Sequence, residues 1–441
     1  MATKNDVLKF IEQNDVKFIR LQFSDIFGRM KNIAINSQLL ERALDEGVIF
    51  DASAIAGFSE VESSDMLLFP DLNTFSIIPW RPQHGKVARF ICDIKNYDGS
   101  QFMGDPRYIL KRSAEKAKKQ GYTFNIGSEC EFFLFNIDAD GMPTTKPHDS
   151  AGYFDVAPAD LGENCRREIC MVLEDMGFET EASHHENAAG QHEVDFRYSD
   201  VMTAADRIMT FKTVVKIVAQ RNGLHATFMP KPIYNDYGSG MHINMSLFKD
   251  GKNLFSAGED SRDISDTAKM FAAGILEHVK GFTAVANPLV NSYKRFVPGF
   301  EAPIHIAWSH MNRSPLLRIP APKGEATRIE LRSPDPSCNP YLTLALILEA
   351  GLDGLQKKME IPEPVDTNTY NLSPEQEKEL KIQRLPSNLY LALEEMKKDT
   401  YIKEVLGEHI YSKYISAKEL EWANYNSTVH PWEIDNYLTA Y

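Results

Sequence analysis

The sequence contains few cysteines, and they do not form a recognisable pairing pattern. Its five cysteines, at positions 92, 130, 165, 170 and 338, include no Cys-x-x-Cys motif. This argues against a disulfide framework and against a closed zinc site. The odd number, together with the lack of an apolar N-terminal leader, fits a reduced cytoplasmic setting. We expect all five thiols to be packing residues.

Long apolar runs, excess positive charge and common phosphate-binding loops are also lacking. The longest apolar stretch, residues 341–352, is interrupted by Thr343, Glu349 and Gly351 and is too short to span a bilayer. A net charge of -14 argues against duplex nucleic acid or an anionic membrane as the main partner. The chain has neither a Gly-x-x-x-x-Gly-Lys-Ser/Thr loop nor a dinucleotide fingerprint. Small charged substrates are still compatible with this composition.

The 441 residues, 43% of them hydrophobic, are enough for a large core and more than one domain. The first hundred residues are rich in β-prone runs, and Asp105-Pro106 then predicts the start of a strong helix. We therefore expect one domain at 1–100 and a second at 101–441. The expected early strands are 17–23, 32–35, 74–78 and 86–94, with a helix at 37–46. The expected later helices are 107–120, 160–176, 204–221, 265–283 and 340–358, with 388–398 and 402–412 in a charged tail that looks peripheral to catalysis.

Several later segments alternate apolar and chemically active residues with the period of a strand. Residues 328–332 read Arg-Ile-Glu-Leu-Arg, which puts a carboxylate between two guanidiniums on one face. In 241–247 the polar residues His242, Asn244 and Ser246 alternate with apolar ones. In 124–135 the side chains of Glu129 and Glu131 are expected to project from the same face of an apolar strand. Two like charges that close repel each other unless a multivalent cation binds between them. For 328–332 the alternative is a solvated strand with surface ion pairs.

Together these segments supply a set of ligands for hard cations such as Mg²⁺ or Mn²⁺. Taken singly, each could be a surface acid or a satisfied histidine. The set is Glu129, Glu131, Glu186, Glu193, His242 and Glu330. Arg295, Arg313 and Arg318 add planar guanidiniums that recognise phosphate or carboxylate. These residues favour a two-metal phosphoryl-transfer enzyme but name no substrate.

Several motifs resemble those of the glutamine synthetase family, in the family's order and over nearly the whole chain. They include Gly127-Ser128-Glu129-Cys130-Glu131, His184-His185-Glu186, Gly190-Gln191-His192-Glu193 and Gly238-Ser239-Gly240-Met241-His242. The length and the ending Val429-His430-Pro431-Trp432-Glu433 look like the short, non-adenylylated alpha branch of class I. The resemblance implies an α+β fold. A small N-terminal β-grasp domain would precede a catalytic domain with a curved antiparallel sheet flanked by helices.

The resemblance also implies the chemistry and the roles of individual residues. Glutamate, ATP and ammonia would give glutamine, ADP and phosphate through a γ-glutamyl phosphate, with two or more Mg²⁺ (or Mn²⁺) ions per active site. Glu131, Glu186 and Glu193 would hold one metal, and Glu129, His242 and Glu330 the other. The implied ATP contacts are Tyr198, Asn244, Ser246, Arg313, Arg318 and Arg328, with Arg313 also stabilising the transferring group. The implied glutamate contacts are Glu131, Gly238, His242, Arg295, Glu301 and Arg332.

The implied ammonium pocket draws on two subunits. Asp51, Ser53, Tyr153 and Glu301 would form it, with Asp51 deprotonating ammonium and Glu301 closing a flap over the intermediate. Asp51 would enter the site of a neighbouring subunit in a dodecamer of two hexameric rings. Nitrogen-regulatory proteins are further expected partners, while nucleic acid and membrane are not.

Three positions depart from the family pattern, and two other functions stay open. Tyr237 stands where an asparagine is usual, and Glu60 where an arginine tied to glutamine feedback is common. Tyr370 stands where other branches carry an adenylylated tyrosine, and an ordinary loop tyrosine is the favoured interpretation. A γ-glutamyl ligase acting on a polyamine or ethanolamine is one alternative, and retention of the ammonium-pocket residues favours ammonia. The other is a catalytically inactive binding protein, although all six metal positions carry ligating residues.

Overall fold

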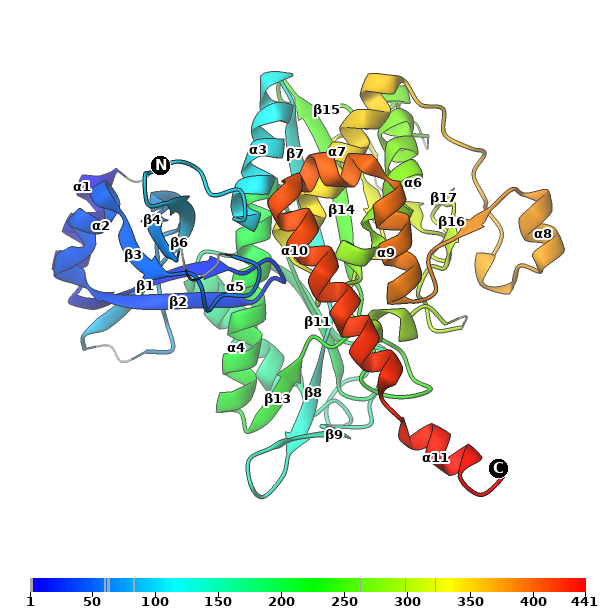
Figure 1. Ribbon diagram of the computed structural model, residues 1–441, viewed down its shortest axis with the longest axis horizontal. Helices are drawn as coiled ribbons and strands as arrows, with labels where there is room; N and C mark the ends of the chain where they lie inside the picture. The colour runs from blue at the N-terminus through cyan, green and yellow to red at the C-terminus, as the bar shows by residue number, and fades with distance from the viewer. Residues whose placement is uncertain are drawn as a thin grey trace.

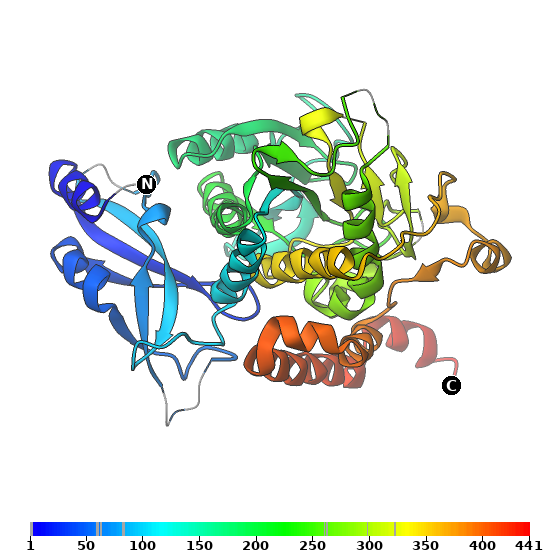
Figure 2. The same cartoon turned by 90° about the horizontal axis from the view of Figure 1, so that it is seen from above.

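The structure is a computed structural model, and it describes residues 3–58, 61, 64–81, 84–259, 261, 263–297, 299–321 and 323–441. A small sheet with two helices lies at one end of the molecule, and a larger body of sheets and helices follows it (Figure 1). Figure 2 shows the same two parts from above, with the C-terminal helices packed along the larger one. The expected α+β fold, with a β-grasp domain before a larger catalytic domain, is confirmed.

The N-terminal sheet has the strand order β2-β1-β6-β4-β3, with β5 paired to β6. Its strands are β1 (Val16–Ser24), β2 (Met30–Asn36), β3 (Val48–Asp51), β4 (Asp65–Pro70), β5 (Ser76–Ile77) and β6 (Lys86–Asn96). β1 and β6 run parallel at its centre, and alternate β1 residues Ile19, Leu21 and Phe23 are buried. Period-2 alternation is typical of a strand with one packed face, and this signal made β1 predictable.

Two N-terminal expectations need correction. The predicted strand 74–78 is reduced to Ser76–Ile77, because the Asp71 carboxylate caps a 3-10 turn at Leu72–Thr74. The predicted helix 37–46 begins as a 3-10 turn, Ser37–Leu39, and becomes α-helical only in α2 (Leu40–Glu46). A further helix, α1 (Lys4–Gln13), was not predicted, although Thr3 and Asp6 form a capping box at its start.

Two sheets form the catalytic domain. One has the order β12-β7-β14-β19-β18-β17, with β15 at the edge, and the other has the order β10-β11-β8-β13, with β9 paired to β8. The first sheet comprises β7 (Thr123–Cys130), β12 (Ser199–Asp200), β14 (Met241–Lys249), β15 (Lys252–Asn253), β17 (Trp308–His310), β18 (Leu317–Ile319) and β19 (Ile329–Leu331). The second comprises β8 (Phe132–Ile137), β9 (Pro143–Pro147), β10 (Thr180–His185), β11 (Gln191–Phe196) and β13 (Leu224–Thr227). A two-stranded pair, β16 (His305–Ile306) and β20 (Gln383–Arg384), lies beside them.

The run 124–135 is not one strand. It changes sheets at Glu131, because β7 ends at Cys130 and β8 begins at Phe132. The Glu131 amide donates to the carbonyl oxygen of Gly240 at 3.1 Å, outside the regular ladder. Glu129 and Glu131 therefore do not project from one continuous strand, and they reach different parts of the site.

The helices surround these sheets, and most lie close to their predicted positions. They are α3 (Pro106–Lys119), α4 (Glu163–Asp175), α5 (Val201–Arg221), α6 (Asp266–Ala286), α7 (Pro340–Lys357), α8 (Pro374–Glu379), α9 (Leu389–Lys398), α10 (Thr400–Ser427) and α11 (Pro431–Tyr437). α6 packs along α7, and α3 contacts both α7 and β7. α4 begins three residues later than expected, because the Asp160 carboxylate instead binds the Arg166 side chain and the Gly162 amide.

The C-terminal helices contribute to the core. α10 is far longer than the predicted 402–412, and Gly407, with φ 76°, interrupts its helical geometry. Ile402, Leu406 and Ile410 are buried in the main hydrophobic core. The tail is therefore part of the domain's packing.

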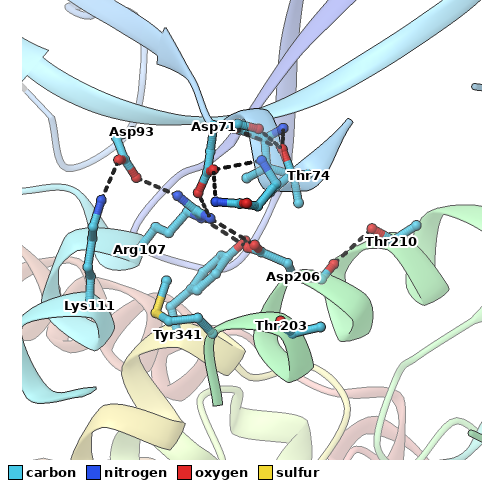
Figure 3. Close-up of polar contacts among 12 residues, drawn as sticks. Asp71, Thr74, Asp93, Arg107, Lys111, Thr203, Asp206, Thr210 and Tyr341 are labelled. Atoms are coloured by element: carbon cyan, nitrogen blue, oxygen red, sulfur yellow. Dashed lines mark hydrogen bonds and ion pairs between the residues drawn. The ribbon is translucent and has the colours of Figure 1, made fainter. Parts of the chain in front are cut away.

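A buried cluster of charged residues joins the two domains (Figure 3). We call it the Arg107 cluster, and it comprises Asp71, Asp93, Arg107, Asp206 and Tyr341. Arg107 Nη2 lies 2.8 Å from Asp71 Oδ2 and 2.9 Å from Asp206 Oδ2, and its Nη1 lies 2.5 Å from Asp93 Oδ1. The Tyr341 hydroxyl donates to Asp206 Oδ1 at 2.7 Å. Because Asp71 and Asp93 belong to the N-terminal domain, these contacts fix it against α3, α5 and α7.

In the described part of the chain, no helix combines the length and apolar character needed to cross a membrane. All five cysteines are unpaired, and four are buried.

Candidate active site

Three predicted metal ligands come together on neighbouring strands of the first catalytic sheet. In the β7–β14 register Glu129 lies directly opposite His242. Glu330 follows on β19, opposite Asn244. His242 Nδ1 lies 3.1 Å from Glu129 Oε2 and 3.7 Å from Glu330 Oε1. Ligand atoms of the three residues all lie within 4.8 Å of one another, so this trio can hold one cation.

Two arginines flank the buried acid of this trio. Glu330 is 1% exposed. Arg318 Nη1 lies 2.5 Å from its Oε2, and Arg332 Nη1 lies 2.7 Å from its Oε1. Burial raises the pKa of Glu330, but Arg332 and His242 more than offset it, so the net pKa lies below its ordinary value. The alternating pattern at 328–332 is therefore a buried site, and the alternative of a solvated surface strand is wrong.

The surroundings of His242 favour the neutral form that a metal ligand requires. Burial and the nearby Arg332 lower the pKa of its imidazole. A neutral ring nitrogen can donate its lone pair to a cation. Carboxylates with one neutral imidazole fit a hard divalent cation better than a structural zinc ion.

A cavity of about 410 Å³ opens over this sheet, and we call it the sheet cavity. Four residues expected to contact ATP line it: Tyr198, Asn244, Ser246 and Arg328. Glu129 and Asp195 also line it. Arg328 does not pair with Glu330 as its spacing suggested, because its Nε donates to Asn244 Oδ1 at 3.0 Å. Asn244 in turn donates to Glu129 Oε1 at 2.8 Å.

A much smaller cavity of about 30 Å³, the loop cavity, gathers the residues expected to contact glutamate. The predicted contacts that line it are Glu131, Gly238, His242, Arg295, Glu301 and Arg332. The Arg295 guanidinium is held in place by carbonyl oxygens, at 2.8 Å from that of Ser333 and 3.0 Å from that of Arg332. The complete predicted set therefore surrounds one cavity.

Position 240, beside the loop cavity, requires glycine because two side chains pack closely against its backbone. A Cβ at Gly240 would lie 2.6 Å from Arg295 Nη2 and 3.1 Å from His242 Nε2. Both distances are shorter than ordinary contacts, so a side chain there would displace a guanidinium and an imidazole of the site. The Gly240 amide also donates to Glu131 Oε2 at 2.9 Å.

The second predicted metal trio, Glu131, Glu186 and Glu193, is arranged differently from the first. Glu131 and Glu186 line the loop cavity. Glu193 instead forms a trio with His184 and Asp195, whose ligand atoms lie within 4.8 Å of one another. His184 Nε2 is 2.6 Å from Glu186 Oε1 and 3.7 Å from Glu193 Oε1. Sequence reasoning missed His184 and Asp195 as candidate ligands, and the pairing of β10 with β11 places His184 opposite Glu193.

The positive charge near this second acidic region, from Arg295 and Arg332, does not fully compensate its acids. Burial and the nearby Glu186 raise the pKa of Glu131 to about 8. Burial, Asp195 and Glu131 raise the pKa of Glu193. Burial and Glu129 raise the pKa of Asp195 to about 7. A divalent cation would reverse these shifts by supplying the missing charge.

A buried hydrogen-bond network supports the turn between Glu186 and Glu193. Asp149 Oδ1 lies 3.0 Å from His185 Nε2 and accepts from the Gly190 amide at 2.9 Å. His185 Nδ1 lies 2.7 Å from the Glu186 carbonyl oxygen. Sequence reasoning missed this role of Asp149, because its position 36 residues before His185 gave no local signal.

The four residues expected to bind ammonium are split between two places. The Glu301 and Tyr153 side chains lie near Glu186. Glu301 lines the loop cavity with Glu186 and accepts from Asn187 Nδ2 at 3.4 Å, while burial and then the Glu186 charge raise the pKa of Tyr153. Asp51 and Ser53 lie at the end of β3 and line neither cavity. The Ser53 hydroxyl donates to Asp51 Oδ1 at 2.7 Å. The structure therefore does not join the two pairs within one chain.

The departures from the family pattern lie mostly beside the loop cavity. Tyr237 lines it, and its ring meets that of Phe300 edge-on at 5.7 Å. The Tyr370 hydroxyl donates to the Arg313 carbonyl oxygen at 3.3 Å, which ties it to the predicted phosphate arginine. Arg313 itself is exposed and lines neither cavity. Glu60 lies outside the described residues.

Comparison with known proteins identifies relatives over nearly the whole chain. The family model for the glutamine synthetase β-grasp domain matches residues 15–97, and that for the glutamine synthetase catalytic domain matches residues 103–437. A glutamine synthetase of Clostridium saccharobutylicum is 56% identical over 439 residues, covering 100% of this chain and 99% of the relative. One of Staphylococcus aureus (strain MW2) is 53% identical over 440 residues, with the same coverage of both chains.

Solved structures show the same fold. A GmaS/ADP complex has a TM-score of 0.89 and 32% sequence identity, covering 98% of this chain and 99% of that chain. A Plasmodium falciparum glutamine synthetase has a TM-score of 0.88 and 28% identity, covering 99% of each chain. The chain belongs to the glutamine synthetase family and is an enzyme that forms glutamine in an ATP-dependent reaction.

Proposed function

We propose that the active site of this enzyme lies where the sheet cavity meets the loop cavity. One observation supports this placement above the others. Glu129 lines the sheet cavity, His242 lines the loop cavity, and the two side chains lie 3.1 Å apart. A nucleotide in the first cavity and glutamate in the second would thus approach each other at the Glu129–His242–Glu330 trio.

We assign two or more divalent cations, Mg²⁺ or Mn²⁺, to the acidic residues between the cavities. Glu129, His242 and Glu330 would hold one, and Glu131, Glu186 and Glu193 another, with His184 and Asp195 close enough to contribute. When bound, the cations supply positive charge that neutralises phosphate oxygens during transfer. The raised pKa values of Glu131, Glu193 and Asp195 support this assignment, because they indicate acids short of counter-charge.

Residues around the sheet cavity would bind the nucleotide. Tyr198, Asn244, Ser246 and Arg328 would contact ATP, since all four line this cavity. Arg313 and Arg318 would contact phosphate oxygens, and Arg313 would stabilise the transferring group. The exposed Arg313 side chain has to move inward for this role, whereas Arg318 already lies beside Glu330.

Glutamate would bind in the loop cavity, clamped through its carboxylates by Arg295 and Arg332, once the cavity opens beyond its present volume of about 30 Å³. Glu131 and the backbone of Gly238 would contact its amino end, and His242 and Glu301 the reacting end. The side-chain carboxylate would attack the γ-phosphorus of ATP to give γ-glutamyl phosphate and ADP, and ammonia would then displace phosphate. Glu301 would close over this intermediate and exclude water, which would otherwise hydrolyse the acyl phosphate.

The ammonium pocket is proposed to form between subunits. Tyr153 and Glu301 of one chain would meet Asp51 and Ser53 of a neighbour, with Asp51 deprotonating ammonium. The exposed position of Asp51 at the end of β3, away from both cavities, supports this arrangement. It requires an oligomer, for which we propose a dodecamer of two hexameric rings, located in the cytoplasm and open to nitrogen-regulatory proteins. We further assign the chain to the alpha branch of class I, with its domain boundary between residues 100 and 101.

A ligase assay with glutamate, ATP and Mg²⁺ tests the proposed substrates. Ammonium should support phosphate release, while putrescine and ethanolamine should not. Phosphate release with putrescine but none with ammonium would contradict the ammonium pocket. Mixing inactive Asp51→Ala and Glu301→Ala chains before assembly tests the shared site, because some interfaces would then pair an intact Asp51 with an intact Glu301. Recovery of activity in mixed oligomers is expected, and its absence would place both residues in one chain's site.

A further inference from the structure

A third cavity, of about 750 Å³, lies between the N-terminal domain and the catalytic domain. We call it the interdomain cavity. It is bounded by residues 71–76 and β6 on one side, and by α3, the start of β7 and the start of α5 on the other. It shares no lining residue with the sheet cavity or the loop cavity. Its volume falls in the range of small-molecule sites, about 300–1,000 Å³.

Arg89, from β6, lines this cavity and has unused hydrogen-bonding capacity. The residue is 7% exposed. Its Nη2 donates to the Thr210 hydroxyl at 3.0 Å. Its Nε and Nη1 have no hydrogen-bond partner among the described residues. A buried guanidinium with two unpaired nitrogens is unusual, because buried polar groups are nearly always paired.

The acids nearest to Arg89 are already engaged elsewhere. Asp71 and Asp206 both bind Arg107, and Asp206 also accepts from the Tyr341 hydroxyl (Figure 3). Burial lowers the pKa of Arg89, and the charge of Asp206 only partly opposes this. Arg107 has three aspartate partners, whereas Arg89 has no ion-pair partner in the described part of the chain. Arg207, at the edge of the cavity, is only partly buried and donates to the carbonyl oxygens of Arg197 and Gly177. Arg89 is therefore the fully buried guanidinium of this cavity that lacks an anion among the described residues.

The walls of the interdomain cavity include an apolar part beside their charged and polar residues. Phe75, Ala114, Ala117, Phe124, Met176 and Phe178 contribute to this part. A dianion such as a phosphate monoester would be repelled more strongly than a monoanion by Asp71 and Asp206, which line the same cavity. A monoanion with an apolar body matches one free guanidinium beside aromatic and aliphatic walls. Carboxylate also suits the planar fork of arginine.

We propose that the interdomain cavity is a binding site for a small monocarboxylate with an aromatic or branched apolar body, whose carboxylate group is bound by Arg89. The ligand contacts residues 71–76 of the N-terminal domain and α3 and α5 of the catalytic domain at once. Its binding therefore stabilises the relative placement of the two domains. The site is separate from that of the substrate glutamate.

Calorimetric titration of the assembled full-length enzyme with 3-phenylpropanoate tests this proposal. Saturable binding of one molecule per chain is expected. The neutral analogue 3-phenylpropanamide should bind at least about tenfold more weakly, because it lacks the charge that Arg89 recognises. Saturating glutamate and ADP should leave the affinity for 3-phenylpropanoate unchanged.

Variants distinguish the interdomain cavity from other binding places. Arg89→Gln should weaken 3-phenylpropanoate binding at least about tenfold, and Ala114→Trp should abolish it by filling the cavity. Arg42→Gln, on the exposed surface of α2, is the matched control and should bind normally. The acid and amide comparison on the unaltered enzyme keeps the test valid if a variant fails to fold. Absence of saturable binding, equal binding of acid and amide, unchanged binding by Arg89→Gln, or competition by glutamate would each overturn the proposal.

Discussion

Two buried groups of charged residues, the Arg107 cluster and the acidic region of the active site, differ in how their charges are balanced. In the Arg107 cluster three aspartates surround one arginine, and Lys111 also binds Asp93 at 2.8 Å. Burial by itself would lower the pKa of Arg107. The charges of its aspartates outweigh this effect, so the net pKa of Arg107 lies above the ordinary value. In the acidic region the opposite holds, since the pKa values of Glu131, Glu193 and Asp195 are all raised.

This difference separates a structural cluster from a catalytic one. Charges that find their partners within the chain stabilise the fold, because each charged state is favoured by its neighbours. Charges left in excess need a counter-ion from outside the chain. Acids with strongly shifted pKa values in a cavity are a recognised mark of a functional site. Removing one residue from each group should therefore affect different properties of the enzyme.

Removing the central acid of the first metal trio should have the largest effect. Glu330→Ala deletes a proposed ligand and leaves Arg318 and Arg332 without their carboxylate partner. We expect kcat to fall by about 10³-fold, in the range seen when one group that stabilises transition-state charge is lost. Steady-state phosphate release at saturating ATP, glutamate, ammonium and Mg²⁺ measures this.

Glu349→Ala is the matched control for Glu330→Ala. Glu349 is also a buried acid, 5% exposed, but it pairs with Lys116 and lies in α7, away from both catalytic cavities. Its loss should lower the melting temperature while kcat measured below that temperature stays near normal. Normal turnover in Glu330→Ala would remove the metal assignment for this trio.

The second prediction concerns the Arg107 cluster. Arg107→Met leaves three buried aspartates without their cation, so we expect the free energy of unfolding to fall by about 3 to 5 kcal/mol. Urea unfolding at fixed protein concentration measures the change. Lys111→Met is the control, since its side chain is 40% exposed and the pair should contribute only about 0 to 1 kcal/mol. Equal losses in the two variants would contradict the interpretation of Arg107 as the centre of the cluster.

The third prediction tests the fixed positions of active-site side chains. Gly240→Ala places a Cβ 2.6 Å from Arg295 Nη2 and 3.1 Å from His242 Nε2. Displacing both side chains should lower kcat/KM for glutamate by about tenfold or more, as for other supporting positions around a metal site. Gly152→Ala is the control, because its Cβ would meet only Asp155 Oδ2, at an ordinary 3.7 Å. Unchanged kinetics in Gly240→Ala would show that the loop cavity tolerates rearrangement.

The sequence predicted the elements whose residues repeat with a regular period. β1, β6 and α3 were found because period-2 alternation or a capping pair marks them locally. Glu129, His242 and Glu330 were also identified as candidate ligands, because alternation placed each of them on a strand, but their grouping into one trio came from the family resemblance. The change of sheets at Glu131 was not found, since it depends on a backbone bond to Gly240, far away in the sequence.

Contacts between distant segments account for most of what sequence reasoning missed. Asp149 supports the turn at 186–190 from dozens of positions away, and the Arg107 cluster likewise joins residues that are far apart in the sequence. No local sequence pattern predicts either set of contacts. The roles of Asp195 and His184 were missed for a related reason. A ligand trio is selected by side-chain directions across a hairpin, and only the register of β10 and β11 fixes those directions. Substrate identity came from family resemblance, because charge patterns alone fit many phosphoryl-transfer reactions.

The smallest expected effect concerns His278, a buried histidine whose two ring nitrogens both have carboxylate partners. It tests how charge balance in a buried group changes the free energy of unfolding with pH. His278 Nδ1 lies 2.7 Å from Asp399 Oδ2, its Nε2 lies 2.9 Å from Asp353 Oδ2, and its ring stacks on Tyr401. Two further charged groups face this network: Lys357 binds Asp353 at 2.8 Å, and Glu349 accepts from the Tyr401 hydroxyl at 3.3 Å. Burial lowers the pKa of His278, but the two aspartates outweigh it, so its net pKa is raised.

A histidine with a raised pKa in the folded state stabilises the protein through its protonated form. That contribution is fully present below the unfolded-state pKa of about 6.5 and disappears as pH rises through the folded-state pKa. His278→Gln should therefore lower the free energy of unfolding by about 1 kcal/mol more at pH 5.5 than at pH 9, as expected for hydrogen bonds to a charged group. Urea unfolding at the two pH values measures this. His225→Gln provides the opposite control, because burial lowers the pKa of His225 and its removal should relieve a penalty at low pH. If the stability change caused by each variant were the same at pH 5.5 as at pH 9, the aspartates would not be holding a proton on His278.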